Sequence, residues 1–190
     1  MMTGQHVMTA LLGAAAMVAP ALAHAQTPAP APTSAAPVVQ GTDRPFQAWN
    51  LHCETRTDPA PRVRICGLMS TVTLQDEKGA RNVALQFMLR SVPGAKGWQL
   101  SVDTPIGVWL PDGVQLVRQG KELVRLPFVA CQPKGCQAGV VLTPAQFAAF
   151  VTATDQADAV YRLQTRQTVT LTFSMLGFAD GAAALAKSAD

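Results

Sequence analysis

Apolar and polar residues alternate along several short segments of the chain. The alternation is clearest in three places, at residues 82–89, 98–103 and 168–175. A period of two is typical of strands that place one face in a core and the other in water. Further strands are predicted at Ala48–Cys53, Ile65–Leu74, Val114–Arg118, Glu122–Cys131, Ala138–Leu142 and Val160–Thr165. Nine or ten short strands predict an all-β fold, an antiparallel β-sandwich.

The same alternation predicts which side chains form the core. We expect these residues to face inward: Trp49, Leu68, Leu85, Phe87, Leu89, Trp98, Leu100, Val169, Leu171 and Phe173. Thr168, Thr170 and Thr172 should face water, because they alternate with the apolar residues of their strand. Asp112-Gly113 is the dipeptide of a tight hairpin turn, so we expect a reversal there.

One or two short helices complete the predicted fold. Thr143 followed by Pro144 is a helix start signal, and Phe147 and Phe150 follow at helical spacing. A second helix is predicted from Phe178 to Ala186. Apolar stripes of this kind are usually core packing.

A β-hairpin with a cysteine on each side of its turn is predicted around Pro133-Lys134-Gly135. Apolar runs flank the turn, and Cys131 and Cys136 stand at its neck. A disulfide between them is within reach of the hairpin geometry. Such a bond persists in an oxidising compartment, which indicates export.

Four cysteines in an exported domain imply two disulfides. Pairing Cys131 with Cys136 leaves Cys53 with Cys66. The other interpretations are a metal site and a redox-active pair. Zinc favours Cys-x-x-Cys or nearby histidines, and redox pairs favour Cys-x-x-Cys before a helix, so we favour structural disulfides.

The N-terminus has the features of a signal peptide. The apolar run Val7–Ala19, about 13 residues, is too short to span a bilayer, and Ala23-His24-Ala25 has the small-x-small pattern of a cleavage site. Ala21-Leu22-Ala23 has the same pattern and is a second possible site. We assign residues 1–25 to the signal peptide and 26–44 to a Pro/Ala-rich disordered linker. Residues 45–187 form the sandwich domain. No other run is long enough to be a transmembrane segment.

The net charge and the small number of histidines argue against several functions. The net charge of +3 comes from scattered basic residues, so we expect no nucleic-acid partner. His52 is the one histidine after the cleavage site, and it alternates with Trp49 and Leu51, so it should face solvent. We therefore expect no catalytic residue, no metal site and no cofactor.

An ordered set of motifs resembles the invasion-associated locus B family of alphaproteobacterial exported proteins. The motifs run from about Phe46 to Leu185, and they are Trp49-x-Leu51-x-Cys53, Cys66-Gly67-Leu68, Pro105-Ile106-Gly107-Val108, Asp112-Gly113-Val114, Pro127-Phe128-x-x-Cys131, Gly135-Cys136-x-Ala138 and Ser174-Met175-Leu176-Gly177-Phe178. The resemblance implies an immunoglobulin-like β-sandwich of the periplasm or envelope, without known enzymatic activity. Some members are linked to the invasion of host cells, in particular erythrocytes.

Two classes of function follow. The first is a non-catalytic cell-envelope protein, periplasmic or secreted, that binds an envelope or host-surface protein or glycan. The alternative is a periplasmic enzyme or thiol-redox helper that uses Cys131 and Cys136 or His52. The sequence leaves the oligomeric state open.

Export is the first testable prediction. The apolar run before Ala23-His24-Ala25 should direct secretion, and mass analysis of periplasmic material should find a mature N-terminus near Gln26. Recovery of a chain that still begins at Met1, or accumulation in the cytosol, would contradict it.

Overall fold

The structure is a computed structural model that describes residues 40–56, 63–92 and 97–188. The predicted signal peptide, and the predicted linker up to residue 39, lie outside the described residues. No helix in the described ranges is long and apolar enough to cross a membrane.

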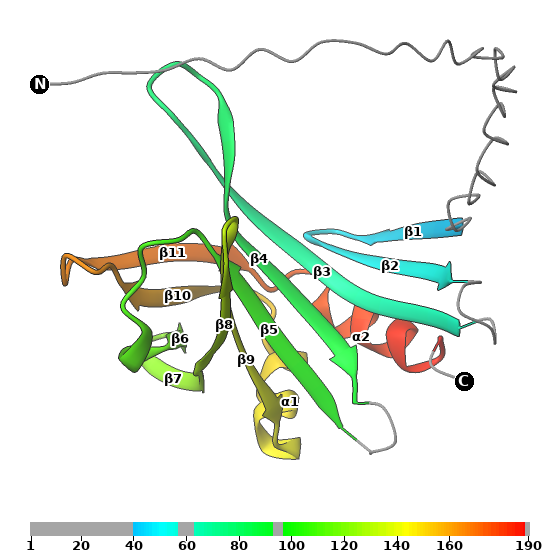
Figure 1. Cartoon of the computed structure of the whole chain (residues 1–190). Coiled ribbons are helices and arrows are strands. Elements are labelled where there is room, and N and C mark those ends of the chain that lie inside the picture. The colour runs from blue at the N-terminus through cyan, green and yellow to red at the C-terminus, as the bar shows by residue number, and fades with distance from the viewer. Residues whose placement is uncertain (1–39, 57–62, 93–96, 189–190) are drawn as a thin grey trace, which may run out of the picture. The chain divides into compact units, whose positions relative to one another are not determined.

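Two antiparallel sheets make up the fold (Figure 1). The first sheet contains, in spatial order, β1 (Gln40–Phe46), β2 (Trp49–Arg56), β3 (Val63–Gln75), β4 (Arg81–Ser91), β5 (Trp98–Thr104), β9 (Gly135–Leu142) and β8 (Phe128–Gln132). The second contains β11 (Thr168–Ser174), β10 (Gln156–Arg162), β6 (Val114–Arg118) and β7 (Lys121–Leu126). The predicted antiparallel sandwich is confirmed, with 11 strands in the described residues.

Both predicted helices form. Helix α1 (Pro144–Val151) begins after Thr143, whose hydroxyl accepts from the Gln146 backbone N–H while the Gln146 side chain accepts from the Thr143 N–H. This reciprocal capping satisfies two backbone donors at the helix start. Helix α2 (Phe178–Ala186) packs against the first four strands of the seven-stranded sheet. A short 3-10 turn, η1, spans Leu110–Asp112.

The core lies between the two sheets and under α2. Most of the predicted inward residues are buried: Trp49, Leu68, Leu85, Phe87, Leu89, Leu100 and Phe173. Trp98, Val169 and Leu171 are partly buried against the same cluster. Thr168, Thr170 and Thr172 are exposed, as the alternation predicted. The ring of Phe87 lies 4.3 Å from that of Phe173, which joins the first sheet to the second.

Two local predictions were wrong. The single strand predicted over Glu122–Cys131 is two strands, β7 and β8, which belong to different sheets. Pro127 separates them, since it has no N–H for a ladder, and its carbonyl accepts from Gly139 N–H at 2.9 Å. Asp112-Gly113 does not form a hairpin turn, because β5 and β6 on either side of it also lie in different sheets.

Strand β1 begins earlier than the predicted domain. Residues 40–44, which we predicted to belong to the linker, form most of this strand. All of β1 pairs with β2. A strand whose side chains include Asp43, Arg44 and Pro45 has little hydrophobic alternation, so its pairing comes from the backbone.

Gly177 holds the start of α2 against the β1–β2 turn. Its φ is +86°, and a Cβ at this position would lie 1.9 Å from the carbonyl oxygen of Phe46. Next to it, Ala48 N–H donates to the Leu176 carbonyl at 3.2 Å. Because the backbones approach so closely, a side chain is excluded here on two grounds, backbone angle and space.

We therefore expect Gly177→Ala to destabilise the fold strongly. Gly120→Ala is the matched control, because Gly120 also has a positive φ (+75°) but has nothing within 4 Å of a Cβ. The control should cost roughly 1–3 kcal/mol through backbone strain alone. Gly177→Ala should cost clearly more, measured by denaturant unfolding. Equal losses would show that the close approach to Phe46 is unimportant.

Candidate functional site

A cleft of about 440 Å³ opens on the outer face of the seven-stranded sheet. We call the outer face the side of this sheet that points away from the core. Strands β4, β5, β8 and β9 and their connections line the cleft with these residues: Val83, Ala84, Gln86, Asp103, Thr104, Pro105, Ala130, Gln132, Lys134, Gly135 and Gln137. Three glutamine amides, one carboxylate and one ammonium group are thus gathered in one place.

The floor of the cleft is a row of polar side chains across three paired strands. Gln86 pairs with Asp103, and Asp103 pairs with Gln137. Residues in register on one face of a sheet lie close together. The Gln137 amide accordingly donates to Asp103 Oδ1 at 3.0 Å. The row presents both donors and acceptors to anything that enters the cleft.

One wall of the cleft is the predicted cysteine hairpin, β8–β9. Cys131 and Cys136 are opposed in register, and the structure joins them by a disulfide with a Cα–Cα distance of 4.0 Å. Cys131 is exposed and Cys136 is buried. The buried Thr104 hydroxyl donates to the Cys136 carbonyl at 3.1 Å. The disulfide closes the neck of the hairpin, and the Thr104 hydrogen bond anchors that neck to β5.

The opposite wall is the base of the β3–β4 hairpin, which projects beyond the rest of the sheet (Figure 1). Pairing between β3 and β4 shifts register at Val72/Thr73, a β-bulge that leaves Ala84 without a partner. The shift turns Val83 outward, so it is 58% exposed although it continues the alternation of Leu85 and Phe87. An irregularity of this kind bends a strand and redirects its side chains, here toward the cleft.

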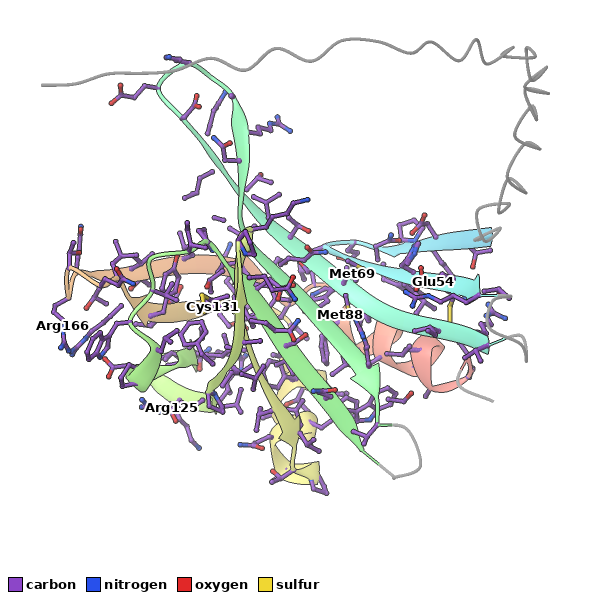
Figure 2. All side chains as sticks on the ribbon, in the orientation of Figure 1. Glu54, Met69, Met88, Arg125, Cys131 and Arg166 are labelled. Atoms are coloured by element: carbon purple, nitrogen blue, oxygen red, sulfur yellow. A yellow bond between two sulfur atoms is a disulfide. The ribbon has the colours of Figure 1, made fainter. Side chains whose placement is uncertain are left out.

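Between the cleft and the N-terminal edge, the outer face carries Met69 and Met88, which are paired across β3 and β4 (Figure 2). Gly67, two residues before Met69 on β3, has no side chain and leaves space that Met88 fills. This middle part of the face has apolar side chains but no charged cluster, and it separates the cleft from His52.

His52 lies on the outer face, 38% exposed at its side chain, in a second and more open hollow. Its Nδ1 lies 2.9 Å from Asp43 Oδ1, and Asn50 donates to the same oxygen. These hydrogen bonds lower the pKa of Asp43 below its usual value. The Ser70 hydroxyl, which also borders the hollow, is turned away and donates to the Ala48 carbonyl. The Ser70 hydroxyl is therefore not aligned with the His52–Asp43 pair.

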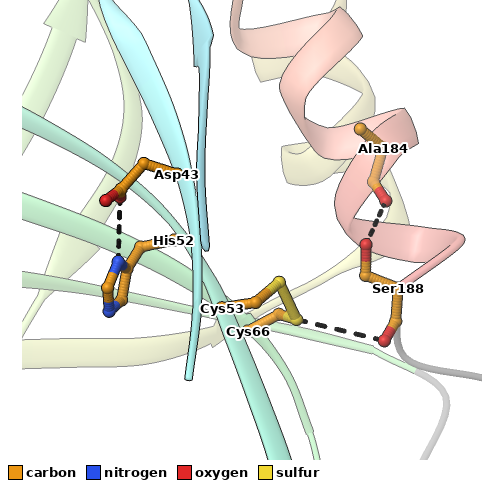
Figure 3. Close-up of a disulfide and its surroundings, with 6 residues drawn as sticks. All are labelled: Asp43, His52, Cys53, Cys66, Ala184 and Ser188. Carbon is orange, nitrogen blue, oxygen red and sulfur yellow. Dashed lines mark hydrogen bonds and ion pairs between the residues drawn. A yellow bond between two sulfur atoms is a disulfide. The ribbon is translucent and has the colours of Figure 1, made fainter. Parts of the chain in front are cut away.

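Cys53 points to the opposite side of β2 from His52 and is joined to Cys66 (Figure 3). These two residues are also directly opposed, on β2 and β3. The carbonyl oxygen of Ser188 lies 4.0 Å from Cys66 Sγ, and the Ser188 hydroxyl donates to Ala184. The disulfide thus lies under the end of α2, in a packed position.

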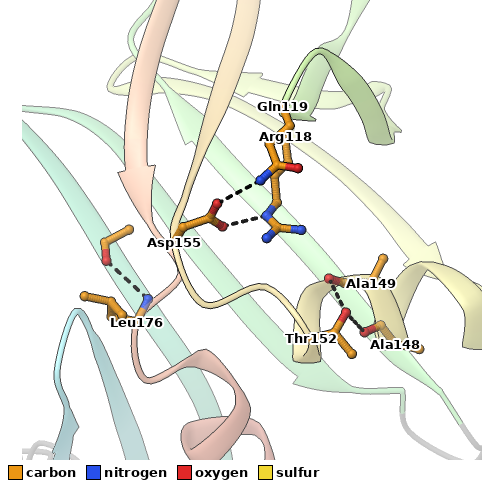
Figure 4. Close-up of polar contacts among 8 residues, drawn as sticks. Arg118, Gln119, Ala148, Ala149, Thr152, Asp155 and Leu176 are labelled. Carbon is orange, nitrogen blue, oxygen red and sulfur yellow. Dashed lines mark hydrogen bonds and ion pairs between the residues drawn. The ribbon is translucent and has the colours of Figure 1, made fainter.

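Ion pairs of the second sheet hold loops in place. Asp155 accepts from Arg118 Nε at 2.6 Å and from the Gln119 amide at 3.3 Å (Figure 4). The hydrogen bond from Arg118 lowers the pKa of Asp155. Arg166 stacks on Trp109, with its guanidinium carbon 3.3 Å from the ring centroid. Over the described ranges, no group of three or more His, Cys, Asp or Glu residues is arranged to hold a metal ion.

The structure therefore separates the residues that sequence reasoning selected. The chain neighbours of Cys131 and Cys136 on β8 and β9 line the cleft, although the two cysteines themselves do not, and His52 and the Cys53–Cys66 pair lie elsewhere on the sheet. Gln86, Asp103 and Gln137 were missed. They are exposed or half-exposed polar residues on three strands, and only strand pairing brings them together.

Comparison with solved structures places the fold. The crystal structure of invasion associated protein B from Bartonella henselae matches with a TM-score of 0.61, over 77% of this chain and 97% of that chain. The sequence identity is 14%, so this likeness concerns the fold alone.

Comparison at the level of sequence gives two results. No curated protein matches the chain. A family model described as the invasion associated locus B (IalB) protein matches residues 49–186, which include every strand from β2 onward and both helices. The chain belongs to the invasion associated locus B family.

Proposed function

We propose that the protein is an exported, non-catalytic interaction protein of the cell envelope, and that it binds its partner in the cleft between the β3–β4 and β8–β9 hairpins. The observation that carries this proposal is the row Gln86–Asp103–Gln137, set between a disulfide-closed wall and a projecting one. Binding sites combine a formed concave surface with a few converging polar groups, and this cleft has both.

The chemistry of the cleft favours a polar partner. Each glutamine amide donates and accepts hydrogen bonds, Asp103 accepts them, and Lys134 donates at the rim. Val83, Ala84 and Ala130 add small apolar contacts. Such a set suits a segment of an envelope or host-surface protein, or a glycan. The related Bartonella structure is of an invasion associated protein, and we extend a role in host-cell invasion or envelope function to this chain.

The proposed location is the periplasm or the exterior. Two disulfides support it, because such bonds persist in oxidising compartments. The apolar run and cleavage motif at the N-terminus support it independently.

A thiol-redox function is the second candidate, and the exposure of Cys131 is the observation in its favour. Reactive cysteines usually lie at a helix N-terminus or beside a cationic side chain that lowers the thiol pKa. The Cys131–Cys136 pair lies between two strands and not at a helix N-terminus, and the Cys53–Cys66 pair is packed under the end of α2. We therefore assign both disulfides a structural role.

Cleft substitutions should abolish partner binding without unfolding the protein. Immobilised mature protein is exposed to cell-envelope extract, and retained components are quantified by mass spectrometry. The double variant Gln86→Ala/Gln137→Ala should retain at least about tenfold less of a specifically bound component than the wild type does. Each lost hydrogen bond contributes about 1 kcal/mol to binding and leaves a group of the partner unpaired.

Gln99→Ala is the matched control for this experiment. Gln99 is exposed on β5 and lies outside the cleft lining. It should retain the component like the wild type. Equal retention by all three proteins, with unchanged melting curves, would refute the cleft as the binding site.

The two disulfides should contribute to stability according to the loops they close. Cys53→Ala/Cys66→Ala removes a bond with a sequence separation of 13 and should cost about 3 kcal/mol. Cys131→Ala/Cys136→Ala removes a bond with a sequence separation of 5 and should lower the free energy of unfolding by about 2 kcal/mol. Thermal unfolding of both variants measures the difference. A reduction potential of either bond close to those of thiol oxidoreductases would instead support the redox function.

A further inference from the structure

Four strands lie at the edges of the two sheets, and three of them carry features that hinder pairing with another strand. β1 contains Asp43, Arg44 and Pro45. β7 carries charged residues and a register shift against β6, and β8 has a register shift against β9 and lies between two prolines. Charges, prolines and bulges at edges are the usual means of preventing edge-to-edge association.

β11 is the exception. Its sequence, Thr168–Ser174, has no charged residue and no proline, and it pairs with β10 over seven consecutive residues without a register shift. A regular, uncharged edge strand is the type that accepts a further strand.

The backbone groups that face this open edge can be identified. Leu163 N–H donates to the Gln167 carbonyl at the hairpin, and Met175 N–H donates to the Asp155 carbonyl at the other end. Because hydrogen-bonded and non-hydrogen-bonded pairs alternate in an antiparallel ladder, the odd-numbered residues of β11 bond to β10. The N–H and C=O groups of Thr168, Thr170 and Thr172 therefore point outward.

The outward carbonyl of Ser174 is already used, since Trp49 Nε1 donates to it at 3.0 Å. Within the part of the chain that the structure describes, no backbone hydrogen bond reaches Thr168, Thr170 or Thr172 from the open side. The outward backbone groups of these three threonines are thus free to bond to another strand, whereas the outward carbonyl of Ser174 is occupied.

We propose that β11 pairs antiparallel with β11 of a second copy of this chain, with the two-fold axis at Thr170. In this register Thr170 faces Thr170 of the other copy, and Thr168 faces Thr172. All three free positions are matched, which gives two four-stranded sheets joined into one. A shift by two residues would oppose Thr168 to the occupied Ser174 and lose bonds.

The side chains are self-complementary in the same register. On the solvent side of the sheet, threonine meets threonine in every pair, a combination that is favourable across strands. On the core side, Val169 meets Leu171 of the other copy. Both residues are only partly buried in the single chain, so pairing would cover apolar surface that is now exposed. No like charges are brought together along the strand.

Sedimentation velocity of the mature protein across a range of concentrations tests the proposal. The wild type should form a concentration-dependent dimer. Thr170→Lys places two like charges on the axis, and Thr170→Pro removes an outward N–H without affecting the bonds to β10, so both should remain monomeric. Thr73→Lys, at an exposed threonine in the β3–β4 hairpin, adds the same charge elsewhere and should dimerise like the wild type.

Cross-linking tests the register. Residues in a hydrogen-bonded antiparallel pair have Cα atoms about 5.5 Å apart, within reach of a disulfide. Oxidation should therefore cross-link Thr170→Cys into a covalent dimer, whereas Thr172→Cys alone should not cross-link, because its partner is Thr168. A monomeric wild type, a dimer that persists in Thr170→Lys, or equal cross-linking of the two cysteine variants would overturn the proposal.

Discussion

The rest of the fold depends on the burial of Trp49. Its side chain is 2% exposed, its ring packs edge-on against Phe178 at 5.0 Å, and its indole N–H donates to the Ser174 carbonyl. One residue of β2 thus contacts the start of α2 and the end of β11, which are 125 or more positions later in the chain. Since a buried indole N–H requires a partner, the first hairpin and the last strand are held in one relative position.

Alternation of apolar and polar residues predicted the faces of the strands well, because burial on one side of a sheet imposes a period of two. It could not predict where that period is interrupted. Val83 continues the pattern of Leu85 and Phe87, yet the bulge at Ala84 turns it into solvent. Residues 122–131 are divided between two sheets at Pro127. The proline ends the first strand, but tertiary contacts decide which sheet the next strand joins.

The candidate site was predictable only in part. The cysteine hairpin has a local signal, a tight turn flanked by two cysteines, and it forms one wall of the cleft. Gln86, Asp103 and Gln137 have no such signal, since polar residues on a solvent-facing side are ordinary in any strand. Likewise, alternation correctly predicted that Thr168, Thr170 and Thr172 face water. It could not predict that their strand lies at a sheet edge, because the order of strands in space decides that.

The position of β1 has a practical consequence for how this family's folding unit is delimited. The family match begins at Trp49, whereas the sheet begins at Gln40, and β1 pairs with β2 from Trp49 to Thr55. A protein truncated to the matched residues would leave the hydrogen-bonding edge of β2 unpaired and would remove the Phe46 carbonyl against which Gly177 packs. Such a fragment would combine an open sheet edge with a loosened helix start, and poor solubility of the fragment would reflect the choice of its boundary rather than a weakness of the native domain.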